Sequence, residues 1–125
     1  MSGRILIVED EYIVAADLAT KLIKLGYEVV GTAASGGEAT QLAEQHRPDV
    51  VLMDIQLQGS MSGTEAAEVI RQKTGCPIIF VTAFAAVFLR DPAIMQPPGL
   101  CISKPFSSTQ LKAALRTVLN DPLVQ

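Results

Sequence analysis

The chain has 125 residues, of which 49% are hydrophobic and 18% charged, with a net charge of −3 and no cluster of Lys or Arg. The length predicts a single domain, residues 1–125, and the composition argues against intrinsic disorder and against nucleic-acid binding by this chain alone. The longest apolar stretch, residues 76–89, is shorter than the about 20 residues of a membrane-spanning helix, and no basic-then-apolar leader opens the sequence. We therefore expect a cytoplasmic protein without membrane contact.

Apolar runs typical of β-strands recur along the chain and alternate with helical patterns. Strands are predicted at residues 4–8, 27–33, 50–53, 78–81 and 100–103. The first and third of these runs do not alternate between apolar and polar residues, which is typical of strands buried on both faces. The alternation of strands and helices from end to end predicts an α/β fold.

Apolar residues at helical spacing follow the first three strands and the fifth. The inner faces of these helices are predicted at Val14, Leu18, Leu22 and Leu25, then at Ala39, Leu42 and Ala43, then at Ala66, Val69 and Ile70, and finally at Leu111, Leu115, Val118 and Leu119. Two helices are predicted to begin with capping boxes, one formed by Ser35 with Glu38 and the other by Ser62 with Glu65.

Five strand–helix units predict a doubly wound, five-stranded parallel sheet with helices on both faces and the strand order 2-1-3-4-5 of flavodoxin-like folds. The region from Ala83 to Gly99 fits this pattern least well. Pro92 has no amide hydrogen to donate inside a helix, and Pro97 and Pro98 force a turn. The fourth helix is therefore expected to be short or distorted.

Polar side chains follow the strands at the edge where ligands bind in such sheets. Glu9 and Asp10 follow the first strand, Asp54 ends the third, Thr82 ends the fourth and Lys104 follows the fifth. Clustered carboxylates favour a cation, and oxygen ligands suit Mg²⁺. A carboxylate can also attack phosphorus to give an aspartyl phosphate. Singly, each residue has an ordinary structural interpretation, such as a helix N-cap for Asp10.

Four segments, residues 5–11, 51–54, 80–83 and 104–106, resemble the receiver domain of two-component response regulators, and the resemblance covers the whole chain. It implies a signalling domain, not an enzyme with a diffusing substrate, which takes a phosphoryl group from a histidine kinase and catalyses only its own phosphoryl transfer and hydrolysis. The implied roles are Asp54 as phospho-acceptor, Glu9, Asp10, Asp54 and the backbone carbonyl of Gln56 as Mg²⁺ site, and Thr82 and Lys104 as partners of the phosphoryl group.

The resemblance also implies a cis peptide bond between Lys104 and Pro105, and the chain departs from the family pattern in three places. The loop at residues 55–63 is one residue longer than usual and has Gln58 in place of proline. Cys101 stands where the family has a switch aromatic, and the fourth helix contains Pro92. We expect signalling through the fourth helix and fifth strand, with a homodimer or effector contact through the 84–104 surface.

Three other functions remain as alternatives. A degenerate receiver would act only as a protein-binding module, although the intact acidic and lysine positions count against it. An aspartyl-phosphate phosphatase of the haloacid-dehalogenase type would carry Asp-x-Asp after its first strand, whereas here the candidate Asp54 follows the third and Gln56 stands two residues later. A flavodoxin-like FMN binder would need a phosphate-binding loop where Glu9, Asp10 and Glu11 stand.

Overall fold

The computed structural model describes residues 3–55, 57, 59, 61–83 and 99–119, and its centre is one parallel sheet. The strands are β1 (Arg4–Val8), β2 (Glu28–Ala33), β3 (Val50–Asp54), β4 (Ile78–Thr82) and β5 (Gly99–Ser103). Their order is β2-β1-β3-β4-β5, and every neighbouring pair is parallel. The predicted α/β class, strand number and strand order are confirmed.

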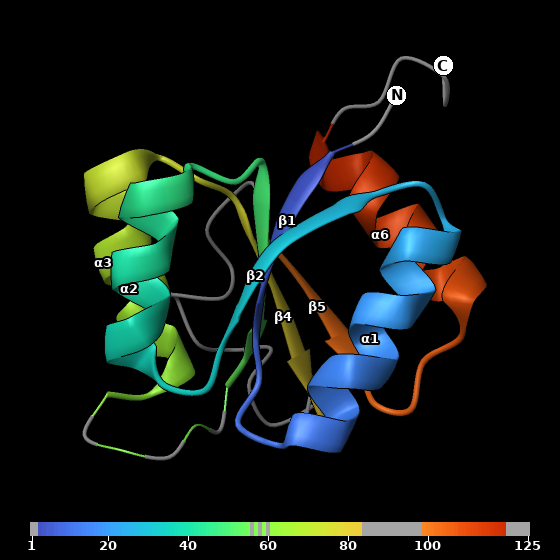
Figure 1. The fold of residues 1–125 in the computed structure, drawn as a ribbon, viewed down its shortest axis with the longest axis horizontal. Coiled ribbons are helices and arrows are strands. Elements are labelled where there is room, and N and C mark those ends of the chain that lie inside the picture. Colours follow the sequence, from blue (N-terminus) through green and yellow to red (C-terminus); the bar gives the residue numbers. More distant parts are fainter. Residues whose placement is uncertain (1–2, 56, 58, 60, 84–98, 120–125) are drawn as a thin grey trace.

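Among the described residues, two helices cover each face of the sheet (Figure 1). Helices α2 (Gly36–His46) and α3 (Gly63–Thr74) pack on one face, and α1 (Tyr12–Lys24) and α6 (Ser108–Leu119) pack on the other. The fourth helix expected from the sequence falls on residues 84–98, which lie outside the described residues, and its distortion stays a prediction.

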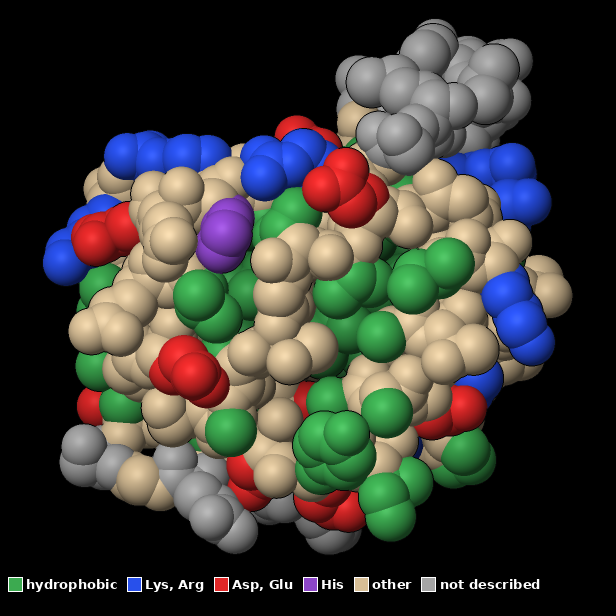
Figure 2. Space-filling view, viewed as in Figure 1, with side chains coloured by type: hydrophobic (Ala, Val, Ile, Leu, Met, Phe, Trp, Pro, Cys, Tyr) green, Lys and Arg blue, Asp and Glu red, His purple; other side chains and the backbone are tan. Residues whose placement is uncertain are grey.

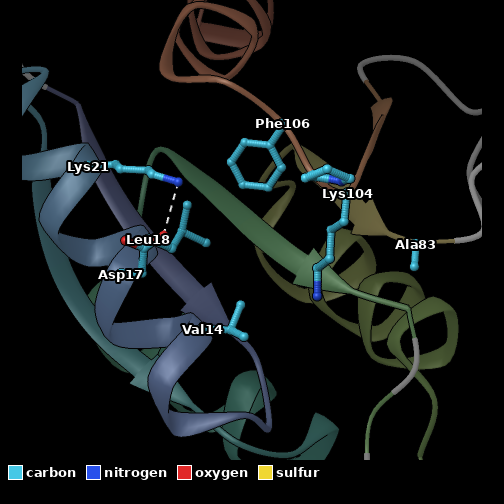
Figure 3. A pocket seen from close by; sticks show the side chains of 8 residues that line it. Val14, Asp17, Leu18, Lys21, Ala83, Lys104 and Phe106 are labelled. Atoms are coloured by element: carbon cyan, nitrogen blue, oxygen red, sulfur yellow. Dashed lines mark ion pairs between the residues drawn. The ribbon is translucent and has the colours of Figure 1, made fainter.

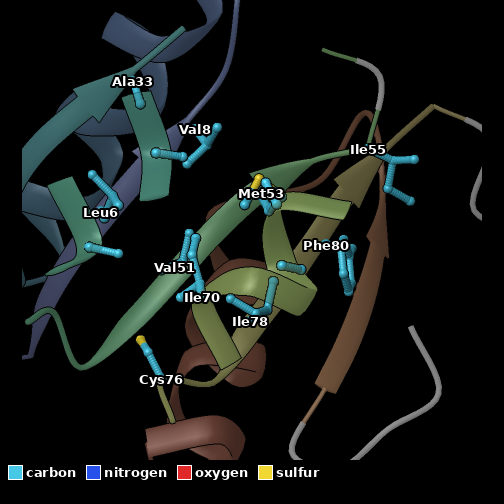
Figure 4. Packing of buried hydrophobic residues seen from close by; sticks show 14 residues of the cluster. Leu6, Val8, Ala33, Val51, Met53, Ile55, Ile70, Cys76, Ile78 and Phe80 are labelled. Carbon is cyan, nitrogen blue, oxygen red and sulfur yellow. The ribbon is translucent and has the colours of Figure 1, made fainter. Parts of the chain in front are cut away.

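The core lies in two layers, one on each side of the sheet, because the central strands are apolar on both faces. All five residues of β3 and of β4 are buried, which confirms for β3 the prediction from its non-alternating run. Figure 4 shows the layer beneath α2 and α3, where Leu6, Val51 and Ile78 from neighbouring strands meet Ile70 of α3. The strands that end in polar residues are therefore anchored on both sides.

Several residues predicted on the inward helix faces are only half-buried, namely Val14, Leu25, Leu42, Val69, Val118 and Leu119. In α1 the buried residues are Ala15, Leu18 and Leu22, and Val14 is only half-buried. In α3, Ala67 is buried and Val69 is half-buried. Each helix is rotated so that a small alanine side chain faces the sheet, which allows the helix to pack closely.

The helix starts follow the sequence signals with one correction. Ser62 and Glu65 form the full capping box of α3. At α2 the Ser35 hydroxyl accepts a hydrogen bond from the N–H of Glu38, but the Glu38 carboxylate accepts from the N–H of Ala34 at 2.8 Å. The predicted reciprocal box at α2 is therefore wrong in its second half, because the side chain reaches one residue further back.

Candidate functional site

Three carboxylates meet at the carboxyl ends of β1 and β3. Glu9 and Asp10 directly follow β1, Asp54 ends β3, and these two strands are neighbours in the sheet. One oxygen from each of the three residues lies within 4.8 Å of the others. Glu9 and Asp54 are buried, and Asp10 is partly exposed. The predicted acidic cluster is present.

The donor set fits a magnesium ion. Mg²⁺ binds oxygen ligands at about 2.1 Å, so two ligands on opposite sides of the ion are about 4 Å apart. The separations among the oxygens of Glu9, Asp10 and Asp54 reach the same range. The partly exposed Asp10 leaves an approach for an ion that keeps several waters. The Gln56 carbonyl, predicted as a further ligand, lies outside the described residues.

Lys104 brings a positive charge to these carboxylates from the end of β5. Its Nζ lies 2.9 Å from Oε2 of Glu9, to which it donates a hydrogen bond, and 3.6 Å from Oδ2 of Asp54. Burial by itself lowers the pKa of Lys104, but the hydrogen bond to Glu9 and the charges of Asp54 and Glu9 together raise it above its ordinary value. The charged ammonium form of Lys104 is therefore stabilised by its two carboxylate neighbours.

The backbone around Thr82 and Lys104 ties β4 to β5 next to the acidic cluster. Thr82 is 1% exposed and ends β4, and its carbonyl accepts a hydrogen bond from the N–H of Lys104 at 2.9 Å. The peptide bond between Lys104 and Pro105 is cis, as expected. In the register of the sheet, Asp54 pairs with Val81, directly before Thr82. The four predicted strand ends thus converge.

Two features of this cluster were not foreseen from the sequence. Glu9, predicted as a metal ligand, is the carboxylate nearest to Lys104, and its second oxygen accepts a hydrogen bond from the N–H of Glu11 at 3.1 Å. Glu11 also occupies the N-cap position of α1, so the ordinary interpretation of Asp10 as that cap is wrong. Glu9 itself is therefore held by two donors, whereas Asp10 remains available to a ligand.

A groove of about 440 Å³ runs beside the cluster between α1 and the segment after β5 (Figure 3). Val14 and Leu18 line one wall and Phe106 the other, and Lys104 closes one side. Lys21 lies 5.6 Å from the centre of the Phe106 ring and pairs with Asp17 at 3.0 Å. The groove is lined mainly by apolar groups and has charged groups at its rim.

Exposed apolar side chains also gather beside the cluster on the first turn of α1. Tyr12 is 85% exposed and Ile13 is 80% exposed, although both are large and apolar. Figure 2 shows hydrophobic side chains next to acidic ones along this edge of the molecule. Isolated exposed apolar residues are common, but two adjacent ones beside a groove form a patch.

Among the described residues, none of the helices combines the length and apolar character needed to cross a bilayer.

A family model described as the response regulator receiver domain matches residues 5–116. The chain is 39% identical over 117 residues to the transcriptional regulatory protein PdtaR of Mycobacterium tuberculosis, covering 94% of this chain and 57% of PdtaR. It is 36% identical over 120 residues to the phyllosphere-induced regulator PhyR of Methylorubrum extorquens, covering 95% and 44% respectively. The chain thus spans about half the length of these curated relatives.

Solved structures show the same similarity. The receiver domain of a modulated diguanylate cyclase from Desulfovibrio desulfuricans superposes with a TM-score of 0.86 at 32% identity, covering 99% of this chain and 98% of that one. The receiver domain of the sensor histidine kinase PA1611 from Pseudomonas aeruginosa, solved with a magnesium ion in its active-site cleft, superposes with a TM-score of 0.84 at 31% identity, covering 97% and 100%. These similarities favour the receiver over the haloacid-dehalogenase and FMN-binding alternatives.

Proposed function

The chain belongs to the family of response regulator receiver domains, and on that basis we propose that Asp54 accepts a phosphoryl group from a histidine kinase in a Mg²⁺-dependent reaction. One observation carries the proposal: a buried acidic side chain at the end of β3 lies among two further carboxylates and one ammonium group. The resulting chemistry belongs to a signalling domain that modifies itself.

The chemistry follows from the charges around Asp54. A carboxylate oxygen of Asp54 attacks phosphorus, the bond from phosphorus to the kinase histidine nitrogen breaks, and that nitrogen leaves with the electron pair. Glu9, Asp10 and Asp54 would hold Mg²⁺, which would neutralise the charge of the phosphoryl oxygens. Lys104 supplies a positive charge next to Asp54, and the Thr82 hydroxyl is an added donor at the end of β4.

We assign the kinase to the surface made by the groove and the first turn of α1. The donor histidine has to reach Asp54, and the groove lies next to it because Lys104 both lines the groove and contacts the acceptor. Tyr12 and Ile13 extend the apolar surface beyond the groove. Exposed apolar groups with a charged rim suit a transient protein partner.

We propose that the output signal passes through β5, which pairs with β4 next to the site. Thr82 pairs with Ser103 and Phe80 pairs with Cys101 in the sheet, so a movement of Thr82 toward a phosphoryl group acts on β5 directly. The Cys101 side chain is too small to transmit this movement as an aromatic ring would. We therefore assign the output surface to β5 together with residues 84–98, which lie outside the described residues. The proposed partner that binds this surface is an effector or a second copy of the chain.

The test is the intact mass of the protein after incubation with acetyl phosphate. With Mg²⁺ the wild-type chain is expected to gain one phosphoryl group, and with EDTA it is expected to gain none. Asp54→Asn should gain none, whereas Asp49→Asn should behave as wild type, because Asp49 lies before β3 at the other end of the strand and bonds the N–H of Arg4. An adduct that persists in Asp54→Asn contradicts the assignment. No adduct in the wild type, with retained kinase binding, favours the degenerate receiver.

A further inference from the structure

The loop after Asp54 is closed against the backbone of the acceptor itself. Gly63, the first residue of α3, donates its N–H to the carbonyl of Ile55 at 2.9 Å. A Cβ at Gly63 would lie 2.7 Å from Cα of Ile55 and closer still to the carbonyl oxygen of Asp54. The φ of Gly63 is outside the left-handed region, so close approach alone excludes a side chain.

A second close contact holds the same loop to helix α2. A Cβ at Gly36, the first residue of α2, would lie 2.9 Å from Cγ of Met61 and 3.0 Å from both Cβ and Sδ of Met61. The shortest of these separations is essentially never seen for Cβ atoms in proteins, and the other two are rare. Rotation of the Met61 side chain can move Cγ and Sδ but not Cβ, which is fixed to the backbone. A methyl group at Gly36 therefore requires residue 61 to shift by a few tenths of an ångström.

Only one residue connects these two contacts, and it is itself held in place. Ser62 caps α3: its hydroxyl accepts from the N–H of Glu65 at 3.2 Å, and its own N–H donates to the Glu65 carboxylate at 3.1 Å. The chain from Met61 through Ser62 to Gly63 therefore has little freedom to absorb a shift. A displacement of Met61 passes to Gly63, which lies directly on the carbonyl of Asp54.

We infer that Gly36 and Met61 are positioning residues for the acidic site, because their contact holds the loop that follows Asp54 against α2. Neither residue supplies an oxygen to the cluster of Glu9, Asp10 and Asp54. They act on the separation of the Asp54 carboxylate from the other two, and so on metal binding. The inference rests on the proposed function only in that the metal serves phosphoryl transfer; the contact between Gly36 and Met61 does not depend on that function.

The experiment measures Mn²⁺ binding to the full chain by electron paramagnetic resonance, with Mn²⁺ as a probe for the Mg²⁺ site. Gly36→Ala is expected to weaken binding about tenfold, as for other residues that orient metal ligands. Gly37→Ala is the matched control, since a Cβ there meets nothing within 4 Å, and it should stay within about twofold of wild type. In the Met61→Gly background, which removes all three contacting atoms of Met61, Gly36→Ala should change the affinity by less than about twofold.

Three results overturn the inference. They are wild-type affinity in Gly36→Ala, an equal loss in Gly37→Ala, and a tenfold loss from Gly36→Ala that persists in the Met61→Gly background. Thermal unfolding tests whether each variant is folded. If Gly36→Ala is not folded, Met61→Ile takes its place with the same expected loss, because isoleucine adds a second carbon to the Cβ that lies next to Gly36.

The two proposals fail in different ways in this design. A wild-type chain that binds Mn²⁺ but gains no phosphoryl group contradicts the proposed function alone. A wild-type chain that is phosphorylated, with Gly36→Ala binding Mn²⁺ equally well, contradicts the positioning role alone. A wild-type chain that binds no Mn²⁺ contradicts both.

Discussion

Replacement of Lys104 by methionine tests how much its ammonium group stabilises the metal-free fold. At an effective dielectric constant of about 20, its separations of 2.9 Å from Glu9 and 3.6 Å from Asp54 correspond to attractions of about 6 and about 5 kcal/mol. Desolvation of the three groups offsets much of this, and removing one partner of a buried ion pair costs about 3 kcal/mol or more. Because the Lys104 side chain is still 24% exposed, we expect Lys104→Met to lower the free energy of unfolding by about 3 kcal/mol and Tm by about 10 °C.

The control is the same substitution at an exposed ion pair of similar length. Lys73 Nζ lies 3.1 Å from Glu44 Oε1, but these side chains are 57% and 44% exposed, against 24% and 4% for Lys104 and Glu9. Lys73→Met is therefore expected to cost less than about 1 kcal/mol. Urea unfolding followed by circular dichroism in EDTA compares the two variants with wild type. Equal costs for the two variants would refute the argument that burial makes the Lys104 pair important.

The effect of Mg²⁺ on Tm provides a second test of Lys104→Met. A divalent cation held by Glu9, Asp10 and Asp54 supplies the positive charge that Lys104→Met removes. Mg²⁺ should therefore raise the Tm of Lys104→Met by more than it raises the Tm of wild type. Equal shifts would show that the lysine and the metal do not stabilise the same carboxylates.

Three further substitutions test other parts of the fold. Burial, with a smaller effect of Asp49, raises the pKa of Cys76 from 9.0 to about 12, so ionisation of Cys76 disfavours the folded state as pH rises from about 9 toward 12. Urea unfolding at pH 7 and pH 11 should show that Cys76→Ala loses less stability over this range than wild type, by up to about 3 kcal/mol. Equal losses of stability in the two proteins would contradict this. Gly63→Ala should lower the free energy of unfolding by about 2 kcal/mol or more through its clash with the end of β3, whereas Gly37→Ala should not lower it. Chemical denaturation of the two variants measures this difference, and equal free energies of unfolding would contradict it. Ser62→Ala should cost about 1 kcal/mol through the loss of the α3 cap, and an unchanged urea midpoint would show that water replaces the hydroxyl.

The sequence by itself determined the strands, their order and the acidic cluster. The apolar runs of β1, β3 and β4 are local signals, and strands without alternation have to be covered on both faces. Right-handed connections then leave few ways to arrange five parallel strands. Since β1 and β3 are neighbours in that arrangement, Glu9, Asp10 and Asp54 meet because they follow or end those strands.

Tertiary structure alone decided which of these groups touch and what holds them in place. Lys104 lies 95 positions from Glu9 in the chain, and its hydrogen bond to that residue depends on where β5 ends relative to β1. The close approaches at Gly36 and Gly63 have no signal in periodicity, because neither glycine has a positive φ and both look like ordinary first residues of helices. Local spacing encodes which face of an element is apolar, whereas separations of a few tenths of an ångström arise only when whole helices and strands pack together.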